Sequence, residues 1–216
     1  MVAIEHTAEI LASAYRNPQR RSVGLTAGVV LAVLLSVGGF LLHGGGVNGT
    51  RFANSLMLFS SSLVFATYYM AGPLSRLVPA AQALGALRFS IAYGFVGMVA
   101  VFLVSILAPD YTTKNSMALP TMSFAALTAL VAVAFLISAG SKRTANSATL
   151  RSLQSLTSGY FWLVFAVMDL DRMQGPHRPD PIPYGLSLLL LVAVLLVRFA
   201  DAFVARHKAG RSVRKF

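Results

Sequence analysis

The stretch VGLTAGVVLAVLLSVGGFLL, residues 23–42, contains no charged side chain and is long enough to span a bilayer. About 20 helical residues cross the hydrocarbon core, because each residue adds roughly 1.5 Å. Five further largely apolar stretches follow, at about 54–74, 88–108, 120–140, 153–170 and 184–204. Hydrophobic residues make up 56% of the 216 residues and charged residues 12%, a composition typical of membrane proteins. The sequence therefore predicts an all-α integral membrane protein, a bundle of six transmembrane helices.

The chain divides into three parts. Residues 1–22 form an N-terminal segment, residues 23–205 the six-helix membrane domain, and residues 206–216 a basic tail. The apolar residues of the first segment share one helical face: Ile4, Ala8, Leu11 and Tyr15. This spacing predicts a short amphipathic helix, which either lies on the inner membrane surface or packs against the bundle. The run 23–42 exceeds a signal-peptide core, so we expect it to be retained as an anchor.

Lys and Arg residues gather on one side of the predicted spans. Fourteen of the 18 lie on this side: Arg16, Arg20, Arg21, Arg76, Arg88, Lys142, Arg143, Arg151, Arg198, Arg206, Lys208, Arg211, Arg214 and Lys215. The opposite connections hold Arg51, Lys114, Arg172 and Arg178. Because basic residues favour the cytoplasmic side, both termini are predicted to be cytoplasmic, in a multi-pass protein of the cell inner membrane. The same pattern explains the net charge of +11 without a nucleic-acid partner.

Acidic and histidine side chains lean towards the outer side. Asp110, Asp169, Asp171 and Asp180 fall there together with His43 and His177. His43 and His177, with Asp169 or Asp171, form a weak candidate metal site, although solvated loop histidines are the favoured interpretation, so no metal is predicted. No catalytic residue is assigned, because no His–Asp pair lies at membrane depth. The absence of cysteine excludes disulfides and thiolate catalysis.

The second span is the most polar. It contains Ser60, Ser61, Ser62 and Thr67. Small hydroxyl residues allow close helix packing, which is the favoured interpretation, and a path for water or a quinone is the alternative. The glycine-rich segment 43–50 before this span predicts a flexible outer turn, and Pro73 is expected to end the span.

Two further pairs of residues predict helix contacts. Gly94 and Gly97 in the third span indicate a face where another helix approaches closely. Arg198 and Asp201, three residues apart near the inner end of the last span, predict an ion pair on one helical face.

Residues 71–95, AGPLSRLVPAAQALGALRFSIAYGF, resemble the junction between the second and third helices of the ferric-reductase-like transmembrane domain family. The matching elements are Pro73-Leu74-Ser75-Arg76-Leu77 and Arg88-Phe89-Ser90, and Thr149–Asp171 resembles the family's fifth helix more loosely. The predicted six spans, with both termini inside, also match the architecture of this family. The resemblance implies a bundle that holds b-type haem between histidines of the third and fifth helices and moves electrons across the membrane.

The chain departs from that family where haem would be ligated. Its four histidines lie outside the apolar cores: His6, His43, His177 and His207. Val101 stands where the third helix would carry histidine, and Phe165 or Ala166 where the fifth would. Other candidate haem ligands are Met70, Met98, Met122, Met168, Tyr93 and Tyr160. Such residues usually fill a core, so no cofactor is predicted, and haem b is the alternative.

The sequence favours a non-enzymatic function. We expect a haem-free protein on a ferric-reductase-like scaffold, acting as a subunit, assembly factor or partner-binding component of a larger membrane complex. Its expected partners are the lipid bilayer and other membrane-protein subunits. A haem-b electron-transfer protein with unusual ligation is one alternative, and a small transporter is another. No predicted span carries a charge at its centre, where transport sites usually have one, so only the polar second span favours transport.

Overall fold

The computed structural model describes residues 18–112, 119–140, 147–174 and 182–213. Within these ranges the chain forms six long α-helices and a short 3₁₀ helix, without a strand, so the all-α prediction is confirmed there. The elements are α2 (Pro18–Leu42), α3 (Gly46–Leu77), η1 (Pro79–Ala81), α4 (Gln82–Thr112), α5 (Leu119–Gly140), α6 (Ala148–Gln174) and α7 (Ile182–Val213). The amphipathic helix predicted near the N-terminus lies outside the described residues. α2 begins before the predicted boundary at residue 23, and α7 continues past residue 205.

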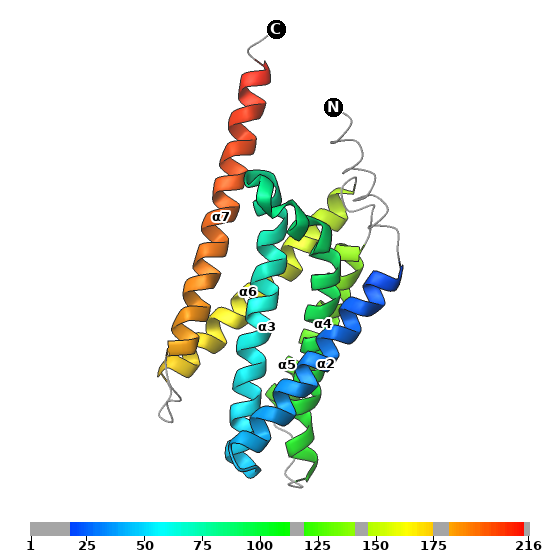
Figure 1. Ribbon diagram of the computed structural model, residues 1–216, viewed down its shortest axis with the longest axis vertical. Helices are drawn as coiled ribbons and strands as arrows, with labels where there is room; N and C mark the ends of the chain where they lie inside the picture. The colour runs from blue at the N-terminus through cyan, green and yellow to red at the C-terminus, as the bar shows by residue number, and fades with distance from the viewer. Residues whose placement is uncertain (1–17, 113–118, 141–146, 175–181, 214–216) are drawn as a thin grey trace.

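The long helices run alternately up and down, as Figure 1 shows. α3 lies at the centre and contacts α2, α4, α6 and α7. α5 packs against α4 and α6, and α7 lies along one edge of the bundle beside α3. Because the six helices alternate in direction, α2 begins and α7 ends on the same side of the bundle, the upper side of Figure 1.

Five of the described helices are long and apolar enough to cross a membrane. The candidate spans are Arg21–Leu42, Gly49–Leu77, Leu87–Leu107, Met122–Ala139 and Tyr184–Val204. The predicted span 153–170 lies within α6, which has 27 residues and is longer than α2 and α5 but is not among these five. Its sequence is interrupted by polar residues such as Gln154 and Asp169, which lower its mean hydropathy. The structure therefore supports a helical membrane protein through five of its helices.

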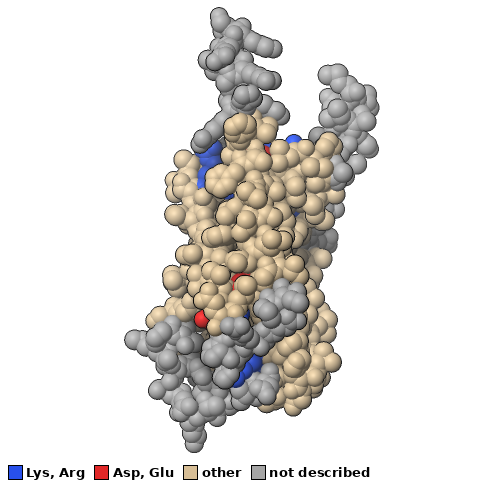
Figure 2. Space-filling view, turned by 90° about the vertical axis from the view of Figure 1, so that its left-hand side faces the viewer, with Lys and Arg blue, Asp and Glu red and all other residues tan. Residues whose placement is uncertain are grey.

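The outer surface of the bundle is apolar. Leu34, Leu41 and Leu42 on α2 are largely exposed, as are Leu189 and Phe199 on α7. Figure 2, which views the α7 side, shows a broad uncharged belt between charged side chains near the upper end and others in the lower half. Exposing so much apolar surface to water is unfavourable, whereas contact with lipid hydrocarbon is not. The uncharged belt therefore agrees with a membrane environment.

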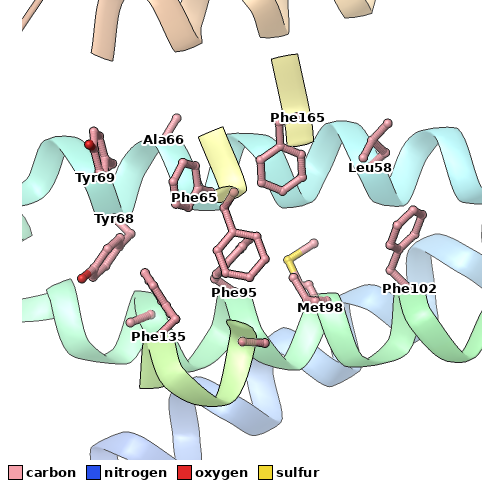
Figure 3. Packing of buried hydrophobic residues seen from close by; sticks show 14 of the residues in the cluster. Leu58, Phe65, Ala66, Tyr68, Tyr69, Phe95, Met98, Phe102, Phe135 and Phe165 are labelled. Carbon is pink, nitrogen blue, oxygen red and sulfur yellow. The ribbon is translucent and has the colours of Figure 1, made fainter. Parts of the chain in front are cut away.

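Phenylalanine rings fill the interior of the bundle. Phe65 of α3, Phe95 of α4, Phe135 of α5, and Phe161 and Phe165 of α6 are all buried. The Phe95 ring is the hub, since its centroid lies 4.9 Å from that of Phe161, 5.3 Å from that of Phe65 and 5.6 Å from that of Phe135. Figure 3 shows the Phe65, Phe95, Phe135 and Phe165 rings converging between α3 and α4. Such tilted and edge-to-face rings add specific contacts to their apolar burial.

Glycines bring α2 and α4 into backbone contact. A Cβ placed at Gly28 would lie 2.1 Å from the carbonyl oxygen of Gly94, and one placed at Gly24 would lie 2.4 Å from that of Ser90. A Cβ at Gly97 would lie 2.9 Å from the carbonyl oxygen of Leu25. The two glycines on α4 that the sequence singles out therefore lie in this crossing. Small residues let helices approach this closely in a membrane.

The connection between α2 and α3 is shorter than predicted. Only residues 43–45 lie outside the helices, so the loop prediction is wrong for residues 46–50, which begin α3. Gly44, Gly45 and Gly46 have φ angles of 71°, 73° and 62°, which glycine adopts without strain. The helix starts early because Gly49 packs on α2, where an added Cβ would lie 2.7 Å from the carbonyl oxygen of Phe40.

Pro73 does not end α3, which continues to Leu77, so this prediction is also wrong. Proline removes one helical hydrogen bond, but a helix surrounded by neighbours can tolerate it. Pro73 is buried in this way. The additional turn carries Arg76 to the end of the bundle.

Candidate functional site

Polar side chains inside the bundle gather in two clusters. The aspartate cluster lies where α3, α6 and α7 meet and consists of Ser55, Ser62, Asp169, Arg172 and Ser187. The arginine cluster joins the last turns of α3 to α4, α6 and α7 and consists of Tyr68, Tyr69, Arg76, Arg88, Gln154, Arg198 and Asp201. The two clusters lie towards opposite ends of α3.

Asp169 is the most unusual residue of the aspartate cluster. Its side chain is fully buried at 0% exposure, and neither carboxylate oxygen has a hydrogen-bond partner among the described residues. The Ser187 hydroxyl of α7 is placed to act as a hydrogen-bond donor towards the carboxylate but is bonded to Ser62, and Arg172, one turn further along α6, acts on it through its charge. A buried carboxylate without hydrogen bonds is costly, so this position invites a functional explanation.

Two hydrogen bonds join the helices that bury the carboxylate. The Ser62 and Ser187 hydroxyls share a hydrogen bond of 2.7 Å that links α3 to α7. Arg172 donates a hydrogen bond to the Ser55 hydroxyl, which links α6 to the first half of α3. These bonds hold together the three helices around Asp169.

The candidate metal ligands are not brought together in the described part of the chain. The His43 ring stacks on Phe52 with their centroids 3.6 Å apart, and Asp171 is exposed on α6. His177 lies outside the described residues. No three His, Cys, Asp or Glu side chains among the described residues lie close enough together to hold a metal ion.

In the arginine cluster, Asp201 has a different partner from the one predicted. Arg76 of α3 donates through both Nε, at 3.0 Å, and Nη2 to the two carboxylate oxygens of Asp201. Arg198, the predicted partner, instead places its guanidinium 3.5 Å from the centre of the Tyr69 ring. The ion pair therefore connects α3 with α7 rather than two positions on α7. Arginine favours this fork-to-fork pairing because of its planar guanidinium.

Tyr68 organises the other half of the arginine cluster. The Arg88 guanidinium lies 4.9 Å from the centre of the Tyr68 ring, and its Nη2 donates to the Tyr68 hydroxyl at 3.4 Å. Gln154 of α6 donates to the same hydroxyl at 2.6 Å. Gly72 borders Arg88, since a Cβ placed there would lie 3.2 Å from Nη1. Three helices are thereby joined at one phenol.

Sequence reasoning did not single out Tyr68, Tyr69 or Gln154 for this role. One signal was available, because Tyr69 and Arg76 are seven residues apart and therefore share a face of α3. The contacts to Gln154 and Arg198 depend on how distant helices pack.

The polar residues of α3 do not line a single path. Ser62 faces α7, and Ser61 is buried without a hydrogen-bond partner in the part of the chain that the structure describes, whereas Thr67 bonds to the carbonyl oxygen of Leu63 in its own helix. Thr67 also borders an apolar groove of about 780 Å³ between α2, α3 and α4. Ser60 is half-buried. Consecutive residues point in different directions around a helix, so this sequence of hydroxyls does not form a continuous channel.

The described residues do not fit a haem. Phe165, at one of the positions where the resemblance would place a histidine, packs 5.7 Å from Phe65 and 6.0 Å from Phe95, measured between ring centres. Met98 belongs to the same apolar core, and the Tyr160 hydroxyl is hydrogen-bonded to Thr128 at 2.7 Å. The other candidate ligands are scattered: Met70 and Met168 are half-buried, Met122 is exposed, and Tyr93 faces Arg21.

No protein-family model matches the chain, and neither a curated protein nor a solved structure is significantly similar to it. The resemblance of residues 71–95 to the ferric-reductase-like family therefore stays a prediction.

Proposed function

We propose that the chain is a six-span membrane protein with both termini in the cytoplasm, which acts without haem as a partner-binding subunit of a membrane complex. The observation that carries the haem-free part is the phenylalanine-filled interior. Five rings occupy the space between α3, α4, α5 and α6, and each contacts at least one other. A cofactor at that place would have to displace this packing, which contributes to the stability of the bundle.

The distribution of side chains on α6 supports it as the sixth span. Its 27 residues extend about 40 Å at roughly 1.5 Å per residue, enough to cross a bilayer. Three of its polar residues, Thr157, Ser158 and Asp169, are buried against other helices, and Ser155 near its start is exposed. Its exposed face carries Leu156, Leu163, Val167 and Leu170. A helix that hides its polar face and presents an apolar one fits lipid despite its low mean hydropathy.

The charges support the proposed orientation. Arg76, Arg88 and Arg198 come together at one end of the bundle. Arg51 and Arg172 lie on turns of α3 and α6 that belong to the other end. The basic excess at the first end favours the cytoplasm for that side.

The apolar groove between α2, α3 and α4 supports a role in binding partners. It is lined almost entirely by apolar side chains and glycine, including Leu31, Leu63 and Met98. In a bilayer such a groove accepts either lipid chains or the side chains of another apolar helix. Packing of that kind drives helix association in membranes.

Two measurements on the protein purified in mild detergent test this proposal. The visible spectrum is expected to lack a Soret band, and mass spectrometry is expected to identify a co-purifying membrane protein. Leu31→Trp and Leu63→Trp, which fill the groove, should release that partner, whereas Leu189→Trp on the exposed face of α7 should retain it. A stoichiometric Soret band would contradict the proposal that the protein acts without haem. Unchanged recovery of the partner with all three variants would contradict the proposal that the groove binds it.

A second candidate function, cation transport, is favoured by the buried Asp169. Ionisable residues at membrane depth often mark ion or proton pathways. In proteoliposomes, Asp169→Asn should then abolish a proton or sodium flux that the wild-type protein supports. The matched control is Asp171→Asn, which alters an exposed carboxylate on the same helix. Equal flux in both variants, or none in the wild type, would remove this candidate.

A further inference from the structure

We propose that the arginine cluster binds a phosphate group, supplied by the headgroup of an anionic phospholipid. The site consists of the guanidinium groups of Arg76, Arg88 and Arg198, positioned by Tyr68 and Tyr69. It borders the phenylalanine-filled interior through Tyr68 and Tyr69 and is distinct from the aspartate cluster. Four observations support it.

The first observation is an excess of positive charge. Arg88 and Arg76 lie close enough to Arg198 to repel it electrostatically. Among the described residues, the carboxylate that joins the cluster is that of Asp201, which is bonded to Arg76. Three guanidinium groups against one carboxylate leave two positive charges. At close range in a partly desolvated site, such repulsion is unfavourable, and a bound anion would relieve it.

The second observation is that hydrogen-bond donors remain in the site. The Nε atoms of Arg88 and Arg198 are buried and have no hydrogen-bond partner among the described residues. An unused buried donor on a charged group is costly, so these atoms suit an acceptor that arrives from outside. Phosphate has enough oxygens to accept from several guanidinium groups at once, often two bonds from one arginine.

The third observation is that the guanidinium groups are held in place. Arg198 lies 3.5 Å from the centre of the Tyr69 ring, and Arg88 lies 4.9 Å from that of Tyr68. Gln154 fixes the Tyr68 hydroxyl with a 2.6 Å hydrogen bond. Stacking on aromatic rings leaves the edges of a guanidinium group available for hydrogen bonds. Less side-chain entropy is then lost when an anion binds.

The fourth observation is the position of the cluster. It lies near the end of α3 and the start of α4, beside η1, where the apolar spans end. The proposed orientation places this end at the cytoplasmic leaflet, which carries anionic lipid headgroups. Tyrosine is also common at this depth. The assignment to a lipid rests on that orientation, whereas the phosphate site itself does not.

The test measures binding to the full-length protein in an uncharged detergent. Thermal unfolding is followed by the fluorescence of Trp162 while dioctanoyl phosphatidic acid, dioctanoylglycerol or inorganic phosphate is titrated. Phosphatidic acid should raise the melting temperature saturably, because a ligand that binds the folded state stabilises it. Dioctanoylglycerol, which has the same chains without the phosphate, should not raise it. An equal response to both lipids would overturn the proposal.

Variants then locate the site. Arg88→Gln and Arg198→Gln should each weaken phosphatidic acid binding about fivefold, the factor expected for one basic side chain near anionic lipid. Arg151→Gln, an exposed position on α6, should bind like the wild type. Unchanged affinity in both cluster variants would overturn the proposal.

Asp201→Asn gives the sharpest result, since it releases Arg76 and raises the excess to three positive charges. Its affinity for phosphatidic acid should increase about fivefold, whereas a merely structural ion pair predicts no increase. This variant still tests the proposed phosphate site if Arg88→Gln fails to fold. An equal or weaker affinity would refute the phosphate site. Inorganic phosphate that binds as tightly as phosphatidic acid would keep the site but refute its lipid source.

Discussion

Replacing Gly28 with alanine should force α2 away from α4. The new methyl group would lie 2.1 Å from the carbonyl oxygen of Gly94 and 2.6 Å from its Cα. Real Cβ contacts essentially never fall below 3.0 Å, so the two backbones must move apart by about 1 Å. Neither obstructing atom belongs to a side chain that could rotate away. Overpacking of this kind typically costs about 1–3 kcal/mol.

Gly38 provides the matched control on the same helix. A Cβ placed there would meet nothing within 4 Å. Gly38→Ala therefore keeps the structure and gains helix propensity, worth up to about 1 kcal/mol. The free energies of unfolding of the two variants should differ by about 1–4 kcal/mol.

The measurement is unfolding in mixed detergent micelles as the denaturing detergent increases, followed by far-UV circular dichroism and Trp162 fluorescence. Gly28→Ala should unfold earlier than the wild type, and Gly38→Ala at the same point or later. If both variants unfolded together with the wild type, α2 and α4 would not touch at these glycines.

Three further predictions concern other parts of the bundle. Asp169→Asn should raise the free energy of unfolding by about 1–3 kcal/mol, because it removes a buried carboxylate without hydrogen bonds; a loss of stability in the same detergent titration would mean that the carboxylate is satisfied. Ser62→Cys with Ser187→Cys should form an oxidative cross-link between α3 and α7, visible by gel mobility after proteolysis, whereas Ser60→Cys with Ser187→Cys should not; the reverse result would place α7 against another face of α3. Phe95→Ala should cost about 3–5 kcal/mol of unfolding free energy, because it empties the hub of the phenylalanine cluster; a change below about 1 kcal/mol would show that the rings do not pack there.

The positions of the helices follow from local sequence. An apolar run of about 20 residues is a property that can be read without neighbours, and each run predicted as a span lies within a helix of the structure. Helix ends are less predictable. Pro73 is an ordinary helix-ending signal, yet α3 continues past it to Leu77, and α3 begins at Gly46, inside the segment that was predicted to be a turn.

The contacts that define the two clusters depend on the tertiary structure. Arg76 and Asp201 are 125 residues apart, and the sequence offered Arg198 as a nearer partner for the same carboxylate. Asp169 lies near the end of its apolar run, where solvent exposure is expected, but α3 and α7 bury it. A helix that is apolar on all sides, such as α4, does not reveal which face will carry the core. The sequence therefore did not predict that Phe95 packs against rings from α3, α5 and α6.

Cysteine accessibility on either end of α6 tests the six-span bundle and its orientation most directly. The chain has no native cysteine, so single cysteines can be introduced at Thr149 and Gln174, which are exposed at the two ends of that helix. In intact cells, a membrane-impermeant thiol reagent should label Gln174→Cys at once and Thr149→Cys only after permeabilisation. Labelling of both in intact cells, or protection of both, would show that α6 does not cross the membrane. The reverse pattern would show that the termini face outwards.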